Sequence, residues 1–156
     1  MKELRIVYVE DDDNDVMLLR HVLRKAGVNI PIQHLPDGER AIEYLSGRGK
    51  YRDRDRFPLP HLILMDIKMP GRDGLSVLKW IRSQPELCGT VVIVFSSSDL
   101  DSDVRRAYEC GANSYLVKPN GLESQMSLVR ALQSFWVEHN QFAPPRRSSR
   151  DHLVEA

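Results

Sequence analysis

Five polar residues in this 156-residue sequence each stand at the end of a short apolar run: Glu10, Asp11, Asp66, Ser96 and Lys118. Three carboxylates in one small volume repel each other unless a cation balances them. Mg²⁺ is suited to this role, because it binds a few carboxylate and carbonyl oxygens and keeps several waters. A carboxylate nucleophile, a divalent cation, a hydroxyl and an ammonium together provide what phosphoryl transfer requires.

The apolar runs themselves predict how these residues come together. The segments "RIVYV", "IPIQHL", "HLILM", "TVVIVF" and "SYLV" recur with helix-like segments between them. This alternation is typical of a parallel sheet covered by helices on both faces, so we expect a five-stranded α/β domain. In such sheets ligands bind at the carboxyl ends of the strands, where all five polar residues are expected.

The acidic segment that follows the first run has two simpler interpretations. Asp and Asn before a helix cap its backbone amides, and we expect Asp13 and Asp15 to do only that. A calcium loop starting at Asp11 is excluded, because Val16 and Val22 occupy the positions that need glycine and glutamate.

Residues near the fourth run also have a purely structural alternative. Ser98 and Asp101 form a capping-box pattern, so Ser96 could merely begin the next helix. The first helix is better defined: Val16, Leu19, Val22, Leu23 and Ala26 share one face, and Gly27 is placed to end it.

Two further segments carry expectations about surfaces. Residues 46–60 contain glycine, proline, five cations and two anions, which predicts an exposed loop, with a partner-contact surface as the alternative. A predicted helix over residues 122–140 has apolar residues on an arc of roughly 200°. We expect a homodimer through this last helix, the alternative being that the chain after it folds back over the apolar face.

Composition sets the remaining limits. Lys plus Arg equals Asp plus Glu at 22 each, so no basic field favours nucleic acid. The N-terminal apolar run is too short for a signal peptide or a membrane span, so a cytoplasmic protein is expected. Cys88 and Cys110 have no metal-ligand spacing, and we expect both thiols to be reduced. We predict one domain over residues 1–140 and a flexible tail over 141–156, without an output domain.

Four motifs, "VED", "MDIKMPGRDG", "FSSSD" and "YLVKP", resemble in order those of the receiver domain of two-component response regulators. The resemblance spans roughly Leu4 to Asn140. It implies a flavodoxin-like fold, with five parallel strands in the order 2-1-3-4-5 and five helices.

The same resemblance implies a role for each matching residue. Asp66 is similar to the phosphoacceptor, Asp11 to a direct Mg²⁺ ligand, Glu10 to an acid acting mainly through water, and Lys68 to the residue whose backbone carbonyl also binds the metal. Ser96, Lys118 and Tyr115 resemble the switch hydroxyl, the lysine and the mobile aromatic residue of the family.

A narrower resemblance rests on the Glu-Asp pair, the long 46–60 segment and "SFWVEH" near the C-terminus. These look like the stand-alone regulators of bacterial phytochrome histidine kinases. The resemblance implies a sensor kinase as partner and dimerisation. It also implies a signalling protein that phosphorylates and dephosphorylates itself and is not a conventional enzyme. Two alternatives stay open: a pure interaction module, and a haloacid-dehalogenase-type phosphohydrolase. The latter needs an acid where this chain has Lys68.

Overall fold

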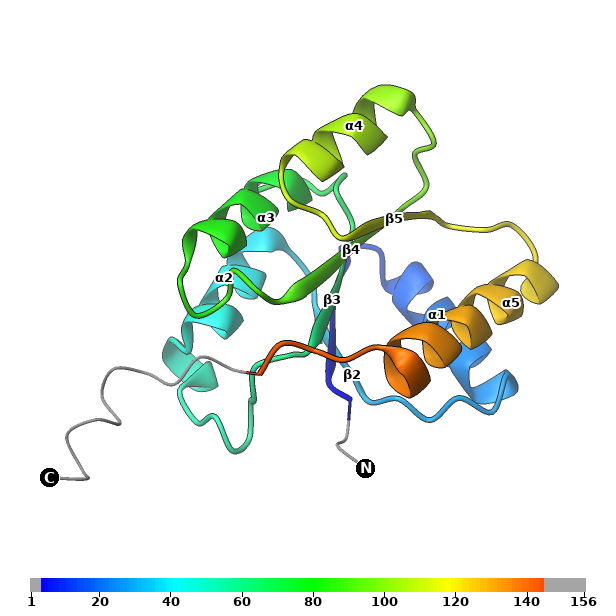
Figure 1. Ribbon diagram of the computed structural model, residues 1–156, viewed down its shortest axis with the longest axis horizontal. Helices are drawn as coiled ribbons and strands as arrows, with labels where there is room; N and C mark the ends of the chain where they lie inside the picture. Colours follow the sequence, from blue (N-terminus) through cyan, green and yellow to red (C-terminus); the bar gives the residue numbers. More distant parts are fainter. Residues whose placement is uncertain (1–3, 145–156) are drawn as a thin grey trace, which may run out of the picture.

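A parallel five-stranded sheet forms the centre of the protein. The computed structural model describes residues 4–144, and its strands lie in the order β2-β1-β3-β4-β5 (Figure 1). This confirms the predicted order. The strand bounds are β1 (Ile6–Val9), β2 (Ile32–Leu35), β3 (Leu62–Met65), β4 (Val91–Ser96) and β5 (Ser114–Val117).

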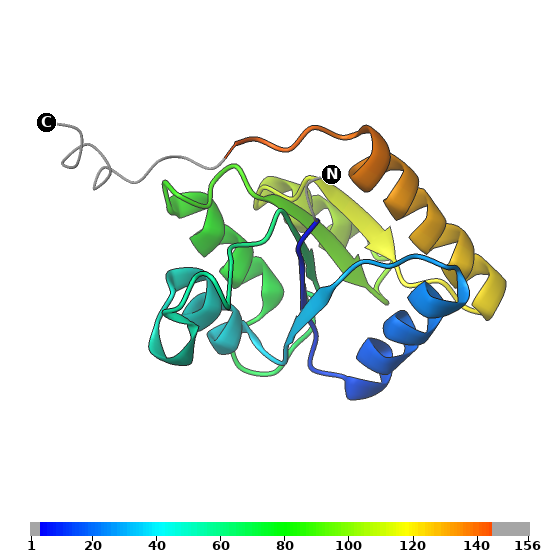
Figure 2. The ribbon, with the colours of Figure 1, turned by 90° about the horizontal axis from the view of Figure 1, so that it is seen from below.

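Five α-helices cover the two faces of the sheet, as expected. Figure 2 shows α1 and α5 together on one face, with α2 and α3 on the other beside α4. Each face has its own apolar core, which contains side chains from the central strands and from the covering helices. The helix bounds are α1 (Asp13–Lys25), α2 (Gly38–Ser46), α3 (Gly74–Ser83), α4 (Asp101–Glu109) and α5 (Leu122–Leu132).

Strand and helix ends follow local chemistry. Asp12 caps α1 by accepting a hydrogen bond from the backbone N–H of Asn14, and the chain leaves the helix at Gly27 in a left-handed conformation with φ of 70°. The strands β1 and β3 are fully buried, which explains why they read as unbroken apolar runs. Because all five strands are parallel, their carboxyl ends lie at the same edge.

The segment over residues 46–60 is more ordered than an exposed loop, and that prediction was wrong for part of it. A 3₁₀ turn (Gly49–Tyr51) buries the Tyr51 ring against Tyr44 and Phe57, with centroids 5.0 and 5.1 Å away. Arg54 donates hydrogen bonds to the carbonyls of Tyr44 and Leu45 at the end of α2. One of the five cations thus satisfies helix carbonyls that would otherwise lack partners.

The last helix changes geometry after α5. Residues Gln133–His139 form a π-helix, whose wider turn breaks the regular projection used for the arc of apolar residues. Phe142, in the predicted tail, packs with its ring centroid 6.2 Å from that of Trp136. Residues 145–156 of that tail lie outside the described residues. Within residues 4–144, no helix combines the length and the apolar character needed to cross a bilayer.

Candidate functional site

An open cleft of about 490 Å³ lies at the carboxyl edge of the sheet. The loops after β1, β3, β4 and β5 form its walls. The cleft brings together all the predicted site residues except Tyr115: Glu10, Asp11, Asp66, Lys68, Ser96 and Lys118. The convergence follows from the parallel sheet, which aligns the residues that terminate neighbouring strands.

Asp66 immediately follows β3 at the floor of the cleft, with only 9% of its side chain exposed. Its backbone N–H donates to the Val9 carbonyl at 3.0 Å, which fixes it beside the end of β1. One carboxylate oxygen, Oδ1, accepts from the Lys68 backbone N–H at 3.1 Å, while Oδ2 lies 3.4 Å from the Lys118 ammonium. The two oxygens therefore have different partners, and Oδ2 faces the cation.

Glu10 is buried, and three donors hold its carboxylate. Oε2 accepts from the Tyr8 hydroxyl at 3.1 Å and from Lys118 at 2.6 Å, while Oε1 accepts from the Asp12 backbone N–H at 3.2 Å. Burial raises the pKa of Glu10 to about 7, although the hydrogen bond from Lys118 opposes the shift. Burial, reinforced by the Glu10 charge, likewise raises the pKa of Tyr8, which keeps its proton to donate.

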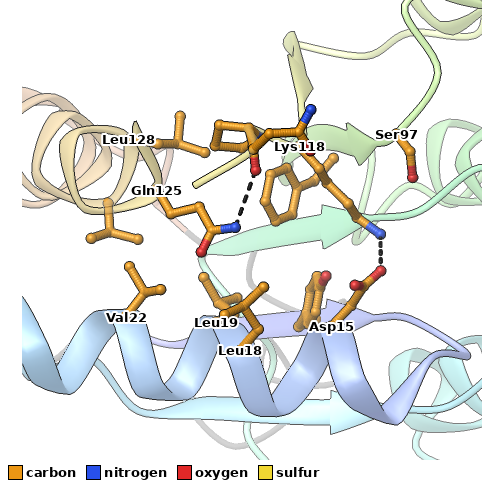
Figure 3. Close-up of a pocket in the computed structure, with 13 residues that line it drawn as sticks. Asp15, Leu18, Leu19, Val22, Ser97, Lys118, Gln125 and Leu128 are labelled. Atoms are coloured by element: carbon orange, nitrogen blue, oxygen red, sulfur yellow. Dashed lines mark hydrogen bonds and ion pairs between the residues drawn. The ribbon is translucent and has the colours of Figure 1, made fainter. Parts of the chain in front are cut away.

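The ammonium of Lys118 interacts with three carboxylates. It lies 2.6 Å from Glu10, 2.7 Å from Asp15 and 3.4 Å from Asp66; Figure 3 shows its contact with Asp15 on α1. Burial by itself would lower the pKa of Lys118, but hydrogen bonds to Asp15 and Glu10 outweigh it and raise that pKa. The side chain is therefore a fixed positive charge at neutral pH.

Asp15 corrects an expectation. We expected it only to cap α1, but the N-cap is Asp12, and Asp15 points to Lys118 instead. Sequence reasoning missed this role, because the partner of Asp15 lies 103 residues further along the chain.

The acids meet the geometric requirement for a metal site. Glu10, Asp11 and Asp66 each offer a carboxylate oxygen, and these oxygens all lie within 4.8 Å of one another. Glu10 and Asp66 are buried whereas Asp11 is exposed, so a bound ion would remain open to solvent on one side. Hard oxygen ligands at this spacing fit a divalent cation that retains waters.

Ser96 and Tyr115 occupy different parts of the switch region. Ser96 ends β4 as a buried residue, and its hydroxyl accepts from the Ser98 backbone N–H at 3.2 Å. Tyr115 lies outside the cleft, half-buried on β5, and its hydroxyl donates to the Ser98 carbonyl at 2.8 Å. Ser98 therefore connects the two, although their side chains do not touch the same cavity.

The capping-box pattern of Ser98 and Asp101 does not form. α4 begins at Asp101 after Leu100, and the Ser98 hydroxyl instead donates to the buried carboxylate of Asp103 at 2.5 Å. The same carboxylate lies 3.3 Å from the Lys68 ammonium. Sequence reasoning missed Asp103, because its contacts depend on how the β4–α4 loop is folded.

Tyr8 was also missed as a supporting residue of the site. It stands two residues before Glu10, and side chains at that spacing point to the same side of a strand. That rule gave a usable signal, but Tyr8 reads as a core residue because it lies within an apolar run.

A second, smaller cavity of about 210 Å³ lies between α1 and α5, behind Lys118 (Figure 3). Leu18, Leu19 and Val22 line its α1 side. Gln125 on α5 enters it and donates from Nε2 to the Pro119 carbonyl at 3.1 Å. The helix thus holds the turn that follows the site lysine.

Comparison with known proteins agrees with this architecture. The response regulator receiver domain matches residues 6–130. The chain is 35% identical to response regulator Rcp1 of Synechocystis sp., over 85% of this chain and 88% of that protein. The Mn²⁺-bound form of Rcp1 superposes with a TM-score of 0.79 at 33% identity, covering 90% of this chain and 99% of the other.

Two other solved structures are similar over nearly the same length. The response regulator RPA3017, in red light signalling of R. palustris, has a TM-score of 0.86 at 30% identity and covers 90% and 99% of the two chains. The phosphorylated cyanobacterial phytochrome response regulator RcpA has a TM-score of 0.82 at 30% identity and covers 91% and 99%. With its motifs, fold and cleft in agreement, the chain belongs to the response regulator receiver domain family.

Proposed function

We propose that this protein accepts a phosphoryl group on Asp66 from the phosphohistidine of a sensor histidine kinase. The observation that carries the proposal is the position of Asp66, whose Oδ2 lies 3.4 Å from the Lys118 ammonium on the floor of an open acidic cleft. A carboxylate in that place is both accessible to a donor and next to a charge that favours an incoming phosphoryl group.

The transfer requires little covalent chemistry from the protein. An Asp66 oxygen forms a bond to phosphorus while the bond from phosphorus to the donor nitrogen or oxygen breaks, and the leaving group takes that electron pair. Lys118 and Ser96 both line the cleft, where they would receive the new phosphoryl oxygens. Water later cleaves the acyl phosphate and restores the carboxylate.

Mg²⁺ is the proposed cofactor. Asp11, Asp66 and the backbone carbonyl of Lys68 would bind it directly, with Glu10 contributing through water. A bound cation would neutralise the clustered carboxylates and bind a phosphoryl oxygen. Glu10 and Asp66 already share Lys118, so the protein keeps these acids together without the metal.

The haloacid-dehalogenase alternative loses support at Lys68. Such a phosphohydrolase needs an acid two residues after its nucleophile, but Lys68 carries an ammonium 3.3 Å from Asp103. The other alternative, an interaction module that is never phosphorylated, is tested by the phosphorylation experiment that follows.

Incubation with Mg²⁺ and acetyl phosphate, followed by intact mass measurement, tests the central proposal. We expect one phosphate adduct on the wild-type protein and none on Asp66→Asn. Asp99→Asn, a substitution of another acid in the same cleft, is the matched control and should keep the adduct. No adduct on wild type, or an adduct on Asp66→Asn, would contradict phosphorylation at this residue.

The partner we propose is a phytochrome-type histidine kinase in the cytoplasm. The support is similarity: RcpA is a phytochrome response regulator and RPA3017 acts in red light signalling. Phosphotransfer from a purified phytochrome kinase should be at least about tenfold faster than from an unrelated histidine kinase, because specificity is a difference in interaction free energies. Equal transfer rates from the two kinases would contradict this pathway.

We also propose a homodimer through the C-terminal helix. Leu122, Phe135 and Val137 on α5 and its π-helical extension are 37%, 56% and 37% exposed in the single chain. Exposed large apolar residues on one helix are typical of an interface. One receiver domain over residues 1–140 and a tail over 141–156 complete the proposed organisation.

A further inference from the structure

Asp103 connects two loops at the rim of the cleft. Its carboxylate Oδ2 accepts from the Ser98 hydroxyl at 2.5 Å and lies 3.3 Å from the Lys68 ammonium. Lys68 belongs to the loop after β3 and Ser98 to the loop after β4, and both line the cleft. A single acid on α4 therefore ties together the two loops on either side of the phosphoacceptor.

The side chains of Asp103 and Lys68, which form this ion pair, differ in how far they are exposed to solvent. Only 13% of the Asp103 side chain is exposed, against 61% for Lys68. The hydrogen bond from Ser98, together with Lys68, holds the pKa of Asp103 below its usual range, so it remains charged. Asp103 is thus the fixed member, while the flexible stem of Lys68 can carry its ammonium elsewhere.

Lys68 also starts next to the reacting carboxylate. Its backbone N–H donates to Asp66 Oδ1 at 3.1 Å. An ammonium released from Asp103 would be available to an anionic donor at Asp66, whereas the paired ammonium has its charge balanced. The electrostatic potential at the mouth of the cleft therefore depends on whether the Lys68 ammonium is paired with Asp103 or is free to approach a donor.

We propose that Asp103 is a positioning residue that keeps the Lys68 ammonium away from incoming phosphoryl donors and thereby limits the rate at which Asp66 is phosphorylated. This inference rests on the proposed function of Asp66. Asp103 does not touch the reacting atoms. It acts through Lys68, and the added negative charge of a phosphoryl group competes with Asp103 for the same ammonium.

A purely structural role for Asp103 makes different predictions. Acids in the first turn of a helix interact favourably with its dipole, and both Asp101 and Asp103 are placed to do so. Asp101 is exposed, and no ion pair joins it to a lysine among the described residues. Asp101→Asn therefore measures the helix contribution alone, and Asp99→Asn measures the loss of one charge from the cleft lining.

The test is a double-mutant cycle on the rate of phosphorylation by acetyl phosphate with Mg²⁺. Asp103→Asn keeps the side-chain volume and an oxygen that can accept from Ser98, but it removes the charge that holds Lys68. We expect a rate constant about fivefold higher than that of wild type, with the gain falling as salt is added. Lys68→Met keeps the backbone carbonyl that is proposed to bind the metal and removes only the ammonium. Alone it should lower the rate less than about twofold, because the charge it removes is already balanced by Asp103.

The double variant distinguishes the two explanations. Asp103→Asn combined with Lys68→Met removes one charge of each sign, and it should return to the wild-type rate because no ammonium remains to be released. The proposal would be overturned if the faster rate persisted in the double variant, or if Asp103→Asn gained no more than Asp99→Asn or Asp101→Asn. It would also be overturned if Lys68→Met had the same effect with Asp103 as with Asn at that position.

Two controls keep the outcome interpretable. Thermal unfolding checks each variant, and if Asp103→Asn does not fold, Asp103→Ala, which has a higher helix propensity, replaces it in the same cycle. If wild-type protein forms no adduct, the proposed function and this inference both fail. If wild type forms an adduct that is lost in Asp66→Asn but the rates are additive, only the role of Asp103 fails.

Discussion

Charge balance within the cleft depends on individual side chains. One ammonium, that of Lys118, lies within 3.4 Å of three carboxylates. Glu10 is the most buried of them and also receives the Tyr8 hydroxyl. One ammonium cannot balance three carboxylates, so the site keeps excess negative charge and favours binding of a further cation.

The raised pKa of Glu10 predicts a pH-dependent stability in the absence of divalent cations. The folded state, with a pKa of about 7 against the ordinary 4.5, binds this proton more tightly than the unfolded chain. The stabilisation is complete below pH 4.5 and is lost as pH rises to about 7. Comparing wild type with Glu10→Gln in urea, we expect the difference in free energy of unfolding to change by up to about 3 kcal/mol over this range.

Glu109→Gln provides the control, since it makes the same substitution at an exposed position on α4. A difference between wild type and Glu10→Gln that does not vary from pH 4.5 to 7 would contradict the burial of Glu10 as the cause.

Contacts between elements fix the phosphoacceptor loop. Gly74 begins α3 directly beside the loop after β3, and a Cβ added there would lie 2.1 Å from the Asp66 carbonyl oxygen. The lack of a side chain therefore lets α3 approach the backbone of the reacting residue. "MPGRDG" supplies this glycine as well as the turn at Gly71, where φ is 76°.

Gly74→Ala should consequently lower the free energy of unfolding by about 1–3 kcal/mol and slow phosphorylation, because the new methyl group must displace Asp66. Urea denaturation and the acetyl phosphate rate measure the two effects. Gly89→Ala is the control, since its Cβ would only reach ordinary contact, 3.8 Å from Ala143. Equal effects of the two substitutions would show that packing against Asp66 is not the reason.

The sequence was sufficient to predict the elements and most of the cleft. Parallel strands read as apolar runs, and the residues that end them meet at one edge, so Asp66, Ser96 and Lys118 could be placed together. Tyr51 and Arg54 were misjudged because charges surround them in the sequence, while their partners lie on α2. Asp103 could not be found, since its contact with Lys68 joins two separate loops and has no periodicity.

At the scale of the whole molecule, large apolar side chains of the last helix are exposed among the described residues 4–144. If the last helix forms a dimer interface, Phe135→Glu should raise the dimer dissociation constant at least about tenfold, because it places a charge at an apolar contact. Sedimentation velocity over micromolar concentrations measures this. Leu100→Glu is a matched control, since Leu100 and Phe135 are both 56% exposed but Leu100 precedes α4. Wild-type protein that sediments as a monomer throughout would contradict the dimer.

The hydrogen bond from Gln125 to the Pro119 carbonyl connects the last helix to the site. Anything that displaces the first half of α5 must also move or break the contact with the turn after Lys118. Thermodynamic linkage makes such coupling reciprocal: if phosphorylation strengthens association through α5, association strengthens retention of the phosphoryl group by the same factor. The protein's concentration in the cell would then act as an input to the signal, in addition to the kinase.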